Sequence, residues 1–200
     1  MSHGLPQVAA LLAGGQSRRM EGLDKALALI GGERMIDRVL YRLRAQVPQV
    51  LLCAPHDYGT GATAVADLAD GPAGPVGAIR AMALYLAAQG ADGFVTAPVD
   101  APFVPLDLVT RLGEGAPVAM AQCDGTWQPA FALWNVQAVI MALPADRCVQ
   151  KWSLRRLGEE LGAVPVEFAE AGVLTNVNTP QELAQAQAQI ASESAGSGAV

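Results

Sequence analysis

The stretch that decides the fold is Leu11–Lys25, which reads LLAGGQSRRMEGLDK. It continues an apolar run that begins at Val8, and a short apolar run ended by glycines is typical of a buried strand. Gly14 and Gly15 let the backbone turn sharply there and bring its N–H groups close to a ligand. Basic residues follow at Arg18, Arg19 and Lys25. The combination predicts a cradle for a polyanion such as a nucleoside triphosphate, although its spacing matches neither the P-loop nor GxGxxG.

The composition of the chain favours one α/β domain. Its 200 residues are 52% hydrophobic and 16% charged, and a chain of this length buries a substantial core. No apolar run approaches the roughly 18 residues of a membrane helix, and the N-terminus lacks the pattern of a signal peptide. We therefore expect a cytoplasmic protein with no membrane partner.

Charge and cysteine content narrow the functional classes further. The formal net charge is −6, which disfavours a nucleic-acid groove because such a groove needs a basic surface. Cys53, Cys123 and Cys148 stand far apart without a CxxC pair. This pattern favours reduced thiols over a disulfide framework or a zinc site.

Short apolar runs alternate with amphipathic stretches along the chain, as in α/β folds. Strands are expected at 8–12, 50–54, 93–97, 118–123, 130–134 and 164–168, with a short strand within 62–69. Helices are expected at 33–46, 76–89, 105–112, 135–143, 151–161 and 180–190, the last opened by a capping box at Thr179–Glu182. We expect a single domain over residues 1–190 and a disordered polar tail over residues 191–200.

Asp100 is the second informative residue. It follows the strand predicted at 93–97 and stands between Pro98 and Pro102. Ligands of open α/β sheets bind beyond the carboxyl ends of the strands, so a carboxylate there could hold Mg²⁺ on a triphosphate. A turn aspartate between prolines is the alternative.

Several further residues have two interpretations each. Lys25 could be a solvated lysine, but its position soon after the glycine loop favours a role as a phosphate ligand. Of Arg18 and Arg19, Arg19 is the stronger candidate for a functional residue. Asp67, at an expected strand end, could be a cap or a ligand. The remaining candidates could shape their loops or approach a ligand closely, and they are Gly74, Gly77, Asn176 and Asn178.

Taken together, these motifs resemble the molybdenum cofactor guanylyltransferases (MobA family) within the nucleotidyltransferase group. The resemblance spans Val8–Ile190 and is carried by LAGGQSRRMEGLDKALALIGG (12–32), GPAGPVGAI (71–79), PVDAPFVP (98–105) and NVNTPQEL (176–183). It implies a three-layer α/β/α sandwich with a Rossmann-like, mostly parallel sheet, as in nucleotide-diphospho-sugar transferases. It also implies Mg²⁺-dependent transfer of GMP from GTP to molybdopterin, with release of pyrophosphate.

The same resemblance assigns roles to individual residues. Arg19, Lys25 and Asp100 would be catalytic, and Asp100 would hold the Mg²⁺. The nucleotide would be bound by Leu12, Ala13, Gly14, Gly15, Lys25, Asp67 and Asp100. The acceptor would be bound by Arg19, Gly77, Asn176 and Asn178. Molybdoenzymes or cofactor-delivery proteins are the implied protein partners.

Three positions depart from the family pattern and bear on base and acceptor selectivity. Glu21 stands in place of a glycine, Cys53 in place of an asparagine and Gln128 in place of a histidine. The alternatives therefore stay open: a nucleotidyltransferase of the same fold that uses CTP or another phosphorylated acceptor, or an inactive nucleotide-binding paralogue.

Overall fold

A seven-stranded sheet forms the middle layer of the computed structural model, which describes residues 4–14, 24–170 and 172–197, with side chains up to residue 192. Its strands are β1 (Val8–Leu12), β4 (Gln49–Cys53), β5 (Ala64–Val65), β6 (Gly93–Pro98), β7 (Ala119–Cys123), β8 (Thr126–Asn135) and β9 (Val164–Glu167). They are ordered β5-β4-β1-β6-β8-β7-β9. β8 runs antiparallel to both of its neighbours, while β1, β4, β5 and β6 pair in parallel, as does β7 with β9.

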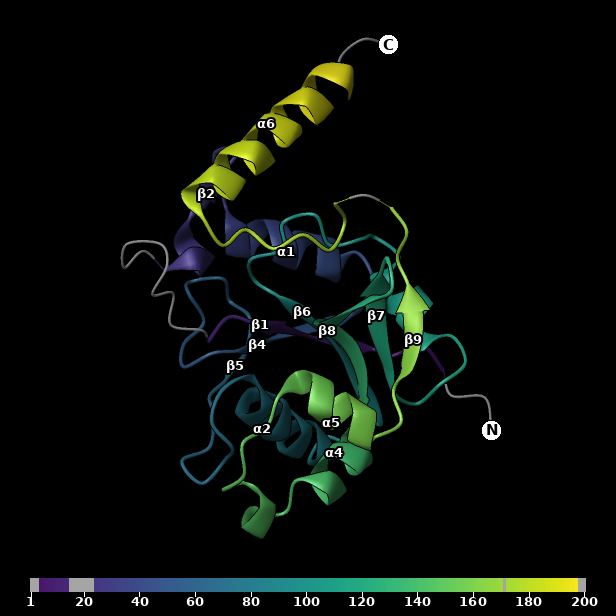
Figure 1. Cartoon of the computed structure of the whole chain (residues 1–200). Helices are drawn as coiled ribbons and strands as arrows, with labels where there is room; N and C mark the ends of the chain where they lie inside the picture. The colour runs from purple at the N-terminus through teal and green to yellow at the C-terminus, as the bar shows by residue number, and fades with distance from the viewer. Residues whose placement is uncertain (1–3, 15–23, 171, 198–200) are drawn as a thin grey trace.

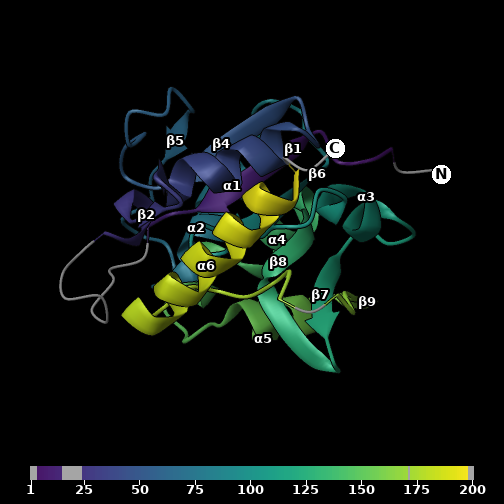
Figure 2. The same cartoon turned by 90° about the horizontal axis from the view of Figure 1, so that it is seen from above.

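Helices cover both faces of this sheet (Figures 1 and 2). One face carries α1 (Met35–Arg44) and α3 (Leu108–Gly113), with α6 (Pro180–Ser197) beyond α1. The other face carries α2 (Pro75–Ala87), α4 (Val136–Ala142) and α5 (Leu154–Glu160). The expected three-layer sandwich with a mostly parallel sheet is therefore confirmed.

Alternation along the strands explains the two cores. In β1, Ala9 and Leu11 join the cluster beneath α1, whereas Val8 and Ala10 join the cluster beneath α2. Successive side chains of a strand point to opposite faces of the sheet, so a strand covered on both faces reads as a continuous apolar run. This is why the opening strand could be recognised from sequence.

Several element boundaries differ from the sequence-based expectation. The strand expected at 130–134 begins at Thr126, because a turn at Asp124 and Gly125, both with positive φ, closes a hairpin with β7. The helix expected from residue 105 begins only at Leu108. A two-stranded hairpin of β2 (Leu29–Ile30) and β3 (Glu33–Arg34), with the 3₁₀ turns η1 (Lys25–Leu27) and η2 (Ala145–Arg147), was not expected.

The prediction of a disordered tail is wrong for residues 191–197, which continue α6. Residues 191–195 read ASESA and hold no proline or glycine. A helix that is already nucleated extends through such residues at little cost. No helix in the described part of the chain is long and apolar enough to cross a bilayer.

Candidate active site

The candidate site is a pocket of about 500 Å³ at the carboxyl ends of β1, β4 and β6. Gly14, which follows β1, lines it together with Lys25 and Asp100. The glycine turn and the proline-flanked acid thus face one cavity, as the sequence predicts, and this is where ligands of open α/β sheets bind.

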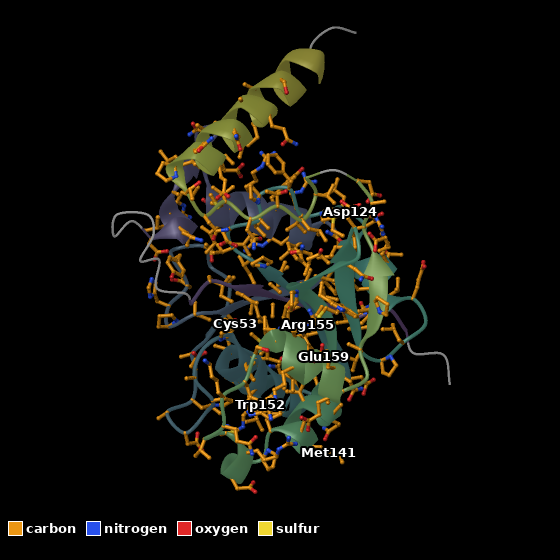
Figure 3. All side chains as sticks on the ribbon, viewed as in Figure 1. Cys53, Asp124, Met141, Trp152, Arg155 and Glu159 are labelled. Carbon is orange, nitrogen blue, oxygen red and sulfur yellow. The ribbon has the colours of Figure 1, made fainter. Side chains whose placement is uncertain are left out.

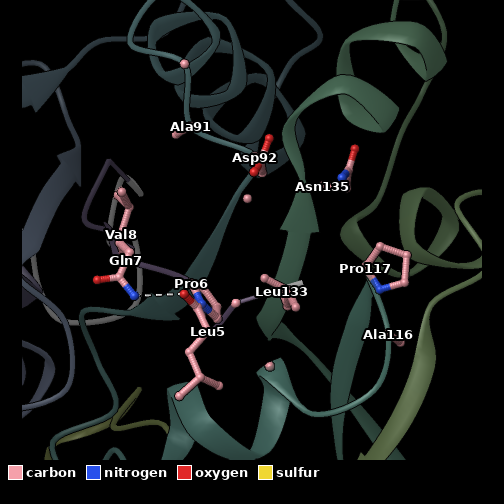
Figure 4. Close-up of a pocket in the computed structure, with 14 residues that line it drawn as sticks. Leu5, Pro6, Gln7, Val8, Ala91, Asp92, Ala116, Pro117, Leu133 and Asn135 are labelled. Carbon is pink, nitrogen blue, oxygen red and sulfur yellow. Dashed lines mark hydrogen bonds between the residues drawn. The ribbon is translucent and has the colours of Figure 1, made fainter. Parts of the chain in front are cut away.

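A second cavity, of about 390 Å³, lies at the opposite ends of the strands (Figure 4). The polar side chains of Gln7 and Asn135 at its wall already bond to nearby backbone, at Leu5 O and Ala138 N respectively. We therefore place the chemistry in the first pocket, where ionised side chains converge.

Lys25 and Asp100 form an ion pair inside the pocket. The Lys25 Nζ donates to Asp100 Oδ2 at 2.8 Å, and the two side chains are only 17% and 15% exposed. The same ammonium donates to Asn178 Oδ1. Lys25 is brought there by η1, which the Asp24 carboxylate caps by accepting from the Ala26 amide. A partly buried ammonium beside a carboxylate suits the binding of phosphate oxygens and of a divalent ion.

The segment that carries both asparagines is tied to the same corner. The Val177 amide donates to the Asp100 carbonyl at 2.7 Å. The Glu182 carboxylate accepts from the amides of Asn178 and Thr179, which completes the expected capping box at the start of α6. These backbone bonds lower the pKa of Glu182, and attraction to Lys25 adds to them.

Asn176 contributes an unpaired acceptor to the pocket. Its side-chain oxygen is buried and has no hydrogen-bond partner among the described residues, and Asn176 lines the cavity. Buried polar atoms are nearly always paired, so this oxygen is a natural acceptor for an N–H or O–H group of a ligand.

The glycine turn is tightly packed. The Ala13 amide donates to the Cys53 carbonyl at 3.1 Å, and a Cβ on Gly14 would lie 3.3 Å from that same oxygen. The first turn of α2 adds Gly74 and Pro75 to the pocket wall. A helix N-terminus favours anions because its amides and dipole point at them. Leu12 and Ala13 also line the cavity.

Cys53 and Asp67, two titratable residues near the end of β4, differ in how deeply they are buried. Cys53 is buried on the face of the sheet covered by α2 and α5 (Figure 3). Burial, helped by the nearby Asp67 carboxylate, raises the pKa of its thiol to about 12, so the thiol stays neutral and is no nucleophile. Asp67 lines the pocket and is exposed overall, and partial burial of its carboxyl raises its pKa.

The other predicted site residues have different placements. Gly77 does not line the pocket; a Cβ there would lie 2.2 Å from the Pro72 carbonyl, so the turn before α2 requires a glycine. Asn178 does not line the pocket, but its side-chain oxygen accepts a hydrogen bond from Lys25, which does. Predictions for Gly15, Arg18, Arg19 and Glu21 fall outside the described residues.

Sequence reasoning missed two residues that support the site. Asp24 lines the pocket and caps the turn that carries Lys25; an aspartate directly before the lysine was a usable capping signal. Tyr58 donates its hydroxyl to the Ala13 carbonyl at 3.1 Å. No pattern in the sequence marks it, since the contact joins loops 45 residues apart.

Asp100 fits the donor set expected for Mg²⁺. Within residues 4–14, 24–170 and 172–197, no group of three or more His, Cys, Asp and Glu side chains could hold a metal by itself. Mg²⁺ is commonly held by one or two carboxylates together with substrate phosphates and water. A single carboxylate in a pocket suited to phosphates is compatible with that mode.

Known proteins resemble this chain over most of its length. The family model described as the MobA-like NTP transferase domain matches residues 9–162. A molybdenum cofactor guanylyltransferase of Cereibacter sphaeroides is 39% identical over 184 residues, which cover 88% of this chain and 93% of that protein. One from Sinorhizobium fredii is 36% identical and covers 90% of this chain and 89% of its own.

Solved structures share the fold. The molybdopterin-guanine dinucleotide biosynthesis protein A of Archaeoglobus fulgidus matches with a TM-score of 0.70 at 23% identity, covering 93% of this chain and 99% of that one. A 2-C-methyl-D-erythritol 4-phosphate cytidylyltransferase from Thermus thermophilus matches with a TM-score of 0.63 at 18% identity, covering 92% and 99%.

Proposed function

The chain belongs to the family of MobA-like NTP transferases, and we propose that it transfers GMP from GTP to molybdopterin, releasing pyrophosphate and forming molybdopterin guanine dinucleotide. The observation that carries the proposal is the convergence of Gly14, Lys25 and Asp100 on one pocket. Its relatives at 36–39% identity over most of the chain are named molybdenum cofactor guanylyltransferases. The reaction would take place in the cytoplasm, and molybdoenzymes or cofactor-delivery proteins would receive the product.

The proposed chemistry needs positioning and charge neutralisation more than proton transfer. The terminal phosphate of the acceptor attacks the α-phosphorus of GTP, and the bond to the β-phosphate breaks. The attacking phosphate is already anionic, so no side chain has to remove a proton from it. Backbone amides of Leu12–Gly14 would hold the nucleotide, while Lys25 offsets negative charge on the phosphates as it develops.

Asp100 would hold Mg²⁺ as part of the same proposal. A bound Mg²⁺ supplies charge neutralisation and orientation of the phosphate oxygens. Asp67, beside the first turn of α2, is assigned to the nucleotide, and Asn176, with its unpaired oxygen, to the acceptor. Arg19 is proposed as a further acceptor-side cation from family resemblance alone.

The experiment is a pyrophosphate-release assay with molybdopterin and, in parallel, GTP, CTP or ATP, each with and without Mg²⁺. We expect product with GTP and Mg²⁺ only. Asp100→Asn should abolish it, whereas Asp92→Asn, an exposed aspartate at the other end of the sheet, should not. Turnover with CTP in place of GTP would refute the base assignment. Failure of molybdopterin in a protein that uses another phosphorylated acceptor would refute the acceptor assignment.

A further inference from the structure

Building on the GTP site proposed above, we propose that Tyr58 is a positioning residue that fixes the backbone after β1 where the nucleotide binds. Tyr58 lies between β4 and β5, outside every motif that carries the family resemblance. It does not line the pocket, so it would act through the residues that do.

The contact that carries this role is with the backbone directly after β1. The Tyr58 hydroxyl donates to the Ala13 carbonyl at 3.1 Å, and the Ala13 amide donates to the Cys53 carbonyl at 3.1 Å. The backbone carbonyl and the backbone amide of Ala13 are therefore both hydrogen-bonded. Since Leu12, Ala13 and Gly14 all line the pocket, the hydroxyl sets the direction in which that backbone presents itself to a nucleotide.

The charge of Asp24 acts on the same phenol. Burial raises the pKa of Tyr58, and the Asp24 carboxylate raises it further. Asp24 also accepts from the Ala26 amide at 3.0 Å and thereby caps the turn that carries Lys25. Tyr58 therefore bonds to the residue after β1 and is influenced electrostatically by the residue before Lys25.

The backbone of Tyr58 is held in an unfavourable conformation. Its φ is +54°, a left-handed value that residues with a side chain seldom adopt. Arg34 donates to the Tyr58 carbonyl at 2.7 Å, and its guanidinium is itself held by Asp37 at 2.8 Å. Strained residues persist where their surroundings hold them, and they cluster at ligand sites.

Packing alone does not explain this tyrosine. Its ring is half-buried against the core beneath α1, and a phenylalanine would fill the same space. The hydroxyl is the part of the side chain that bonds to the Ala13 carbonyl. Tyr58→Phe removes only this oxygen and therefore tests the proposal.

The experiment measures the dissociation constant of GTP, with Mg²⁺, by equilibrium binding, together with the melting temperature without ligand. We expect Tyr58→Phe to raise the GTP dissociation constant about fivefold, because the variant lacks one hydrogen bond that positions the nucleotide-binding backbone. The KM for molybdopterin and the melting temperature should change little. Tyr41→Phe, which removes a hydroxyl from an exposed tyrosine of α1, is the matched control and should leave GTP binding unchanged.

The outcomes separate this proposal from the proposed function. If the unaltered protein does not bind GTP, the proposed function fails. If it binds GTP and Tyr58→Phe binds equally well, Tyr58 has no positioning role. A lower melting temperature with an unchanged dissociation constant would assign the hydroxyl to folding alone and would likewise overturn the proposal.

Discussion

Among single residues, the proposed chemistry depends most on the ammonium of Lys25. In the free protein its charge is matched by Asp100 and oriented by Asn178. Its side chain is 17% exposed, enough for phosphates to reach it. Phosphate oxygens can replace Asn178 as acceptors and can compete for the charge held by Asp100.

Replacing Lys25 by methionine should therefore impair catalysis much more than folding. We expect turnover to fall about a hundredfold or more, since a charge aimed at the reacting phosphate is lost. The Lys25–Asp100 pair is partly buried, so its loss should cost about 1–3 kcal/mol, which corresponds to a fall in melting temperature of about 2–12 °C for a chain of this size. Steady-state kinetics and thermal melts test this, with Lys151→Met at an exposed site as the control. Unfolding of the Lys25 variant at assay temperature would contradict the expectation.

Gly77 belongs to one of the motifs that carry the family resemblance, but the structure explains it by packing. A methyl group there would meet the Pro72 carbonyl, a backbone atom that cannot rotate away. Gly77→Ala should therefore lower the free energy of unfolding by about 1–3 kcal/mol. Denaturant unfolding measures it, and Gly4→Ala, where nothing lies within 4 Å of the added carbon, should have a much smaller effect. Equal stability of Gly77→Ala and the unaltered protein would refute this account.

At the scale of elements, the start of α6 links a helix cap to the active site. The Glu182 carboxylate accepts from the Asn178 amide at 2.7 Å, and the Asn178 side chain accepts from Lys25. The cap thus fixes the backbone that presents an acceptor to Lys25, the proposed catalytic lysine.

Because of this cap, the folded protein should lose some stability as the pH becomes acidic. Because the pKa of Glu182 is lowered on folding, chiefly by the Asn178 amide, its contribution is present above the ordinary pKa of a glutamate. It is lost as the pH falls through the lowered value. Glu182→Gln should therefore melt at a lower temperature than the unaltered protein at neutral pH, and the difference should shrink in acid. Melting curves across this range test it, and a difference that grew as the pH fell would contradict it.

The charge-matched control is Glu114→Gln, at an exposed position that follows α3. It removes the same charge without touching a helix cap at the site. We expect its melting temperature to follow that of the unaltered protein across the pH range.

Elements defined by local signals could be predicted from the sequence. The run Val8–Leu12 reads as a buried strand because both of its faces are covered, and Thr179–Glu182 reads as a helix start because its cap is built from adjacent residues. The antiparallel hairpin of β7 and β8 was only partly visible. Its tip depends on positive φ at Asp124, a conformation that aspartate adopts only occasionally.

Long-range contacts of the site could not be predicted. Asn178 meets Lys25 across 153 residues of sequence, and Tyr58 meets Ala13 across 45. No periodicity encodes such pairs, since they depend on strand order and on loop paths. Asn178 was a candidate both from its place in the segment 174–179 and from the family resemblance, whereas Tyr58 belongs to none of the motifs and was found only in the structure.

At the scale of the whole molecule, the pocket joins parts of the chain that are far apart in sequence. Three of them are the end of β1 with η1, the end of β6, and the segment before α6. The first two belong to parallel neighbours in the sheet, and the third is held to Asp100 by the Val177 amide. A ligand that contacts all three binds the folded chain and cannot bind the unfolded one.

GTP with Mg²⁺ should therefore raise the melting temperature of the whole domain. A ligand at 100 times its dissociation constant stabilises the folded state by about 2.7 kcal/mol, which corresponds to about 5–10 °C for a chain of this size. With Asp100→Asn, the part of the shift that depends on Mg²⁺ should disappear, while Asp92→Asn should retain the full shift. Differential scanning fluorimetry with GTP, with Mg²⁺ and with both measures these terms. A shift of the same size in Asp100→Asn would show that Asp100 plays no part in binding the nucleotide with its metal.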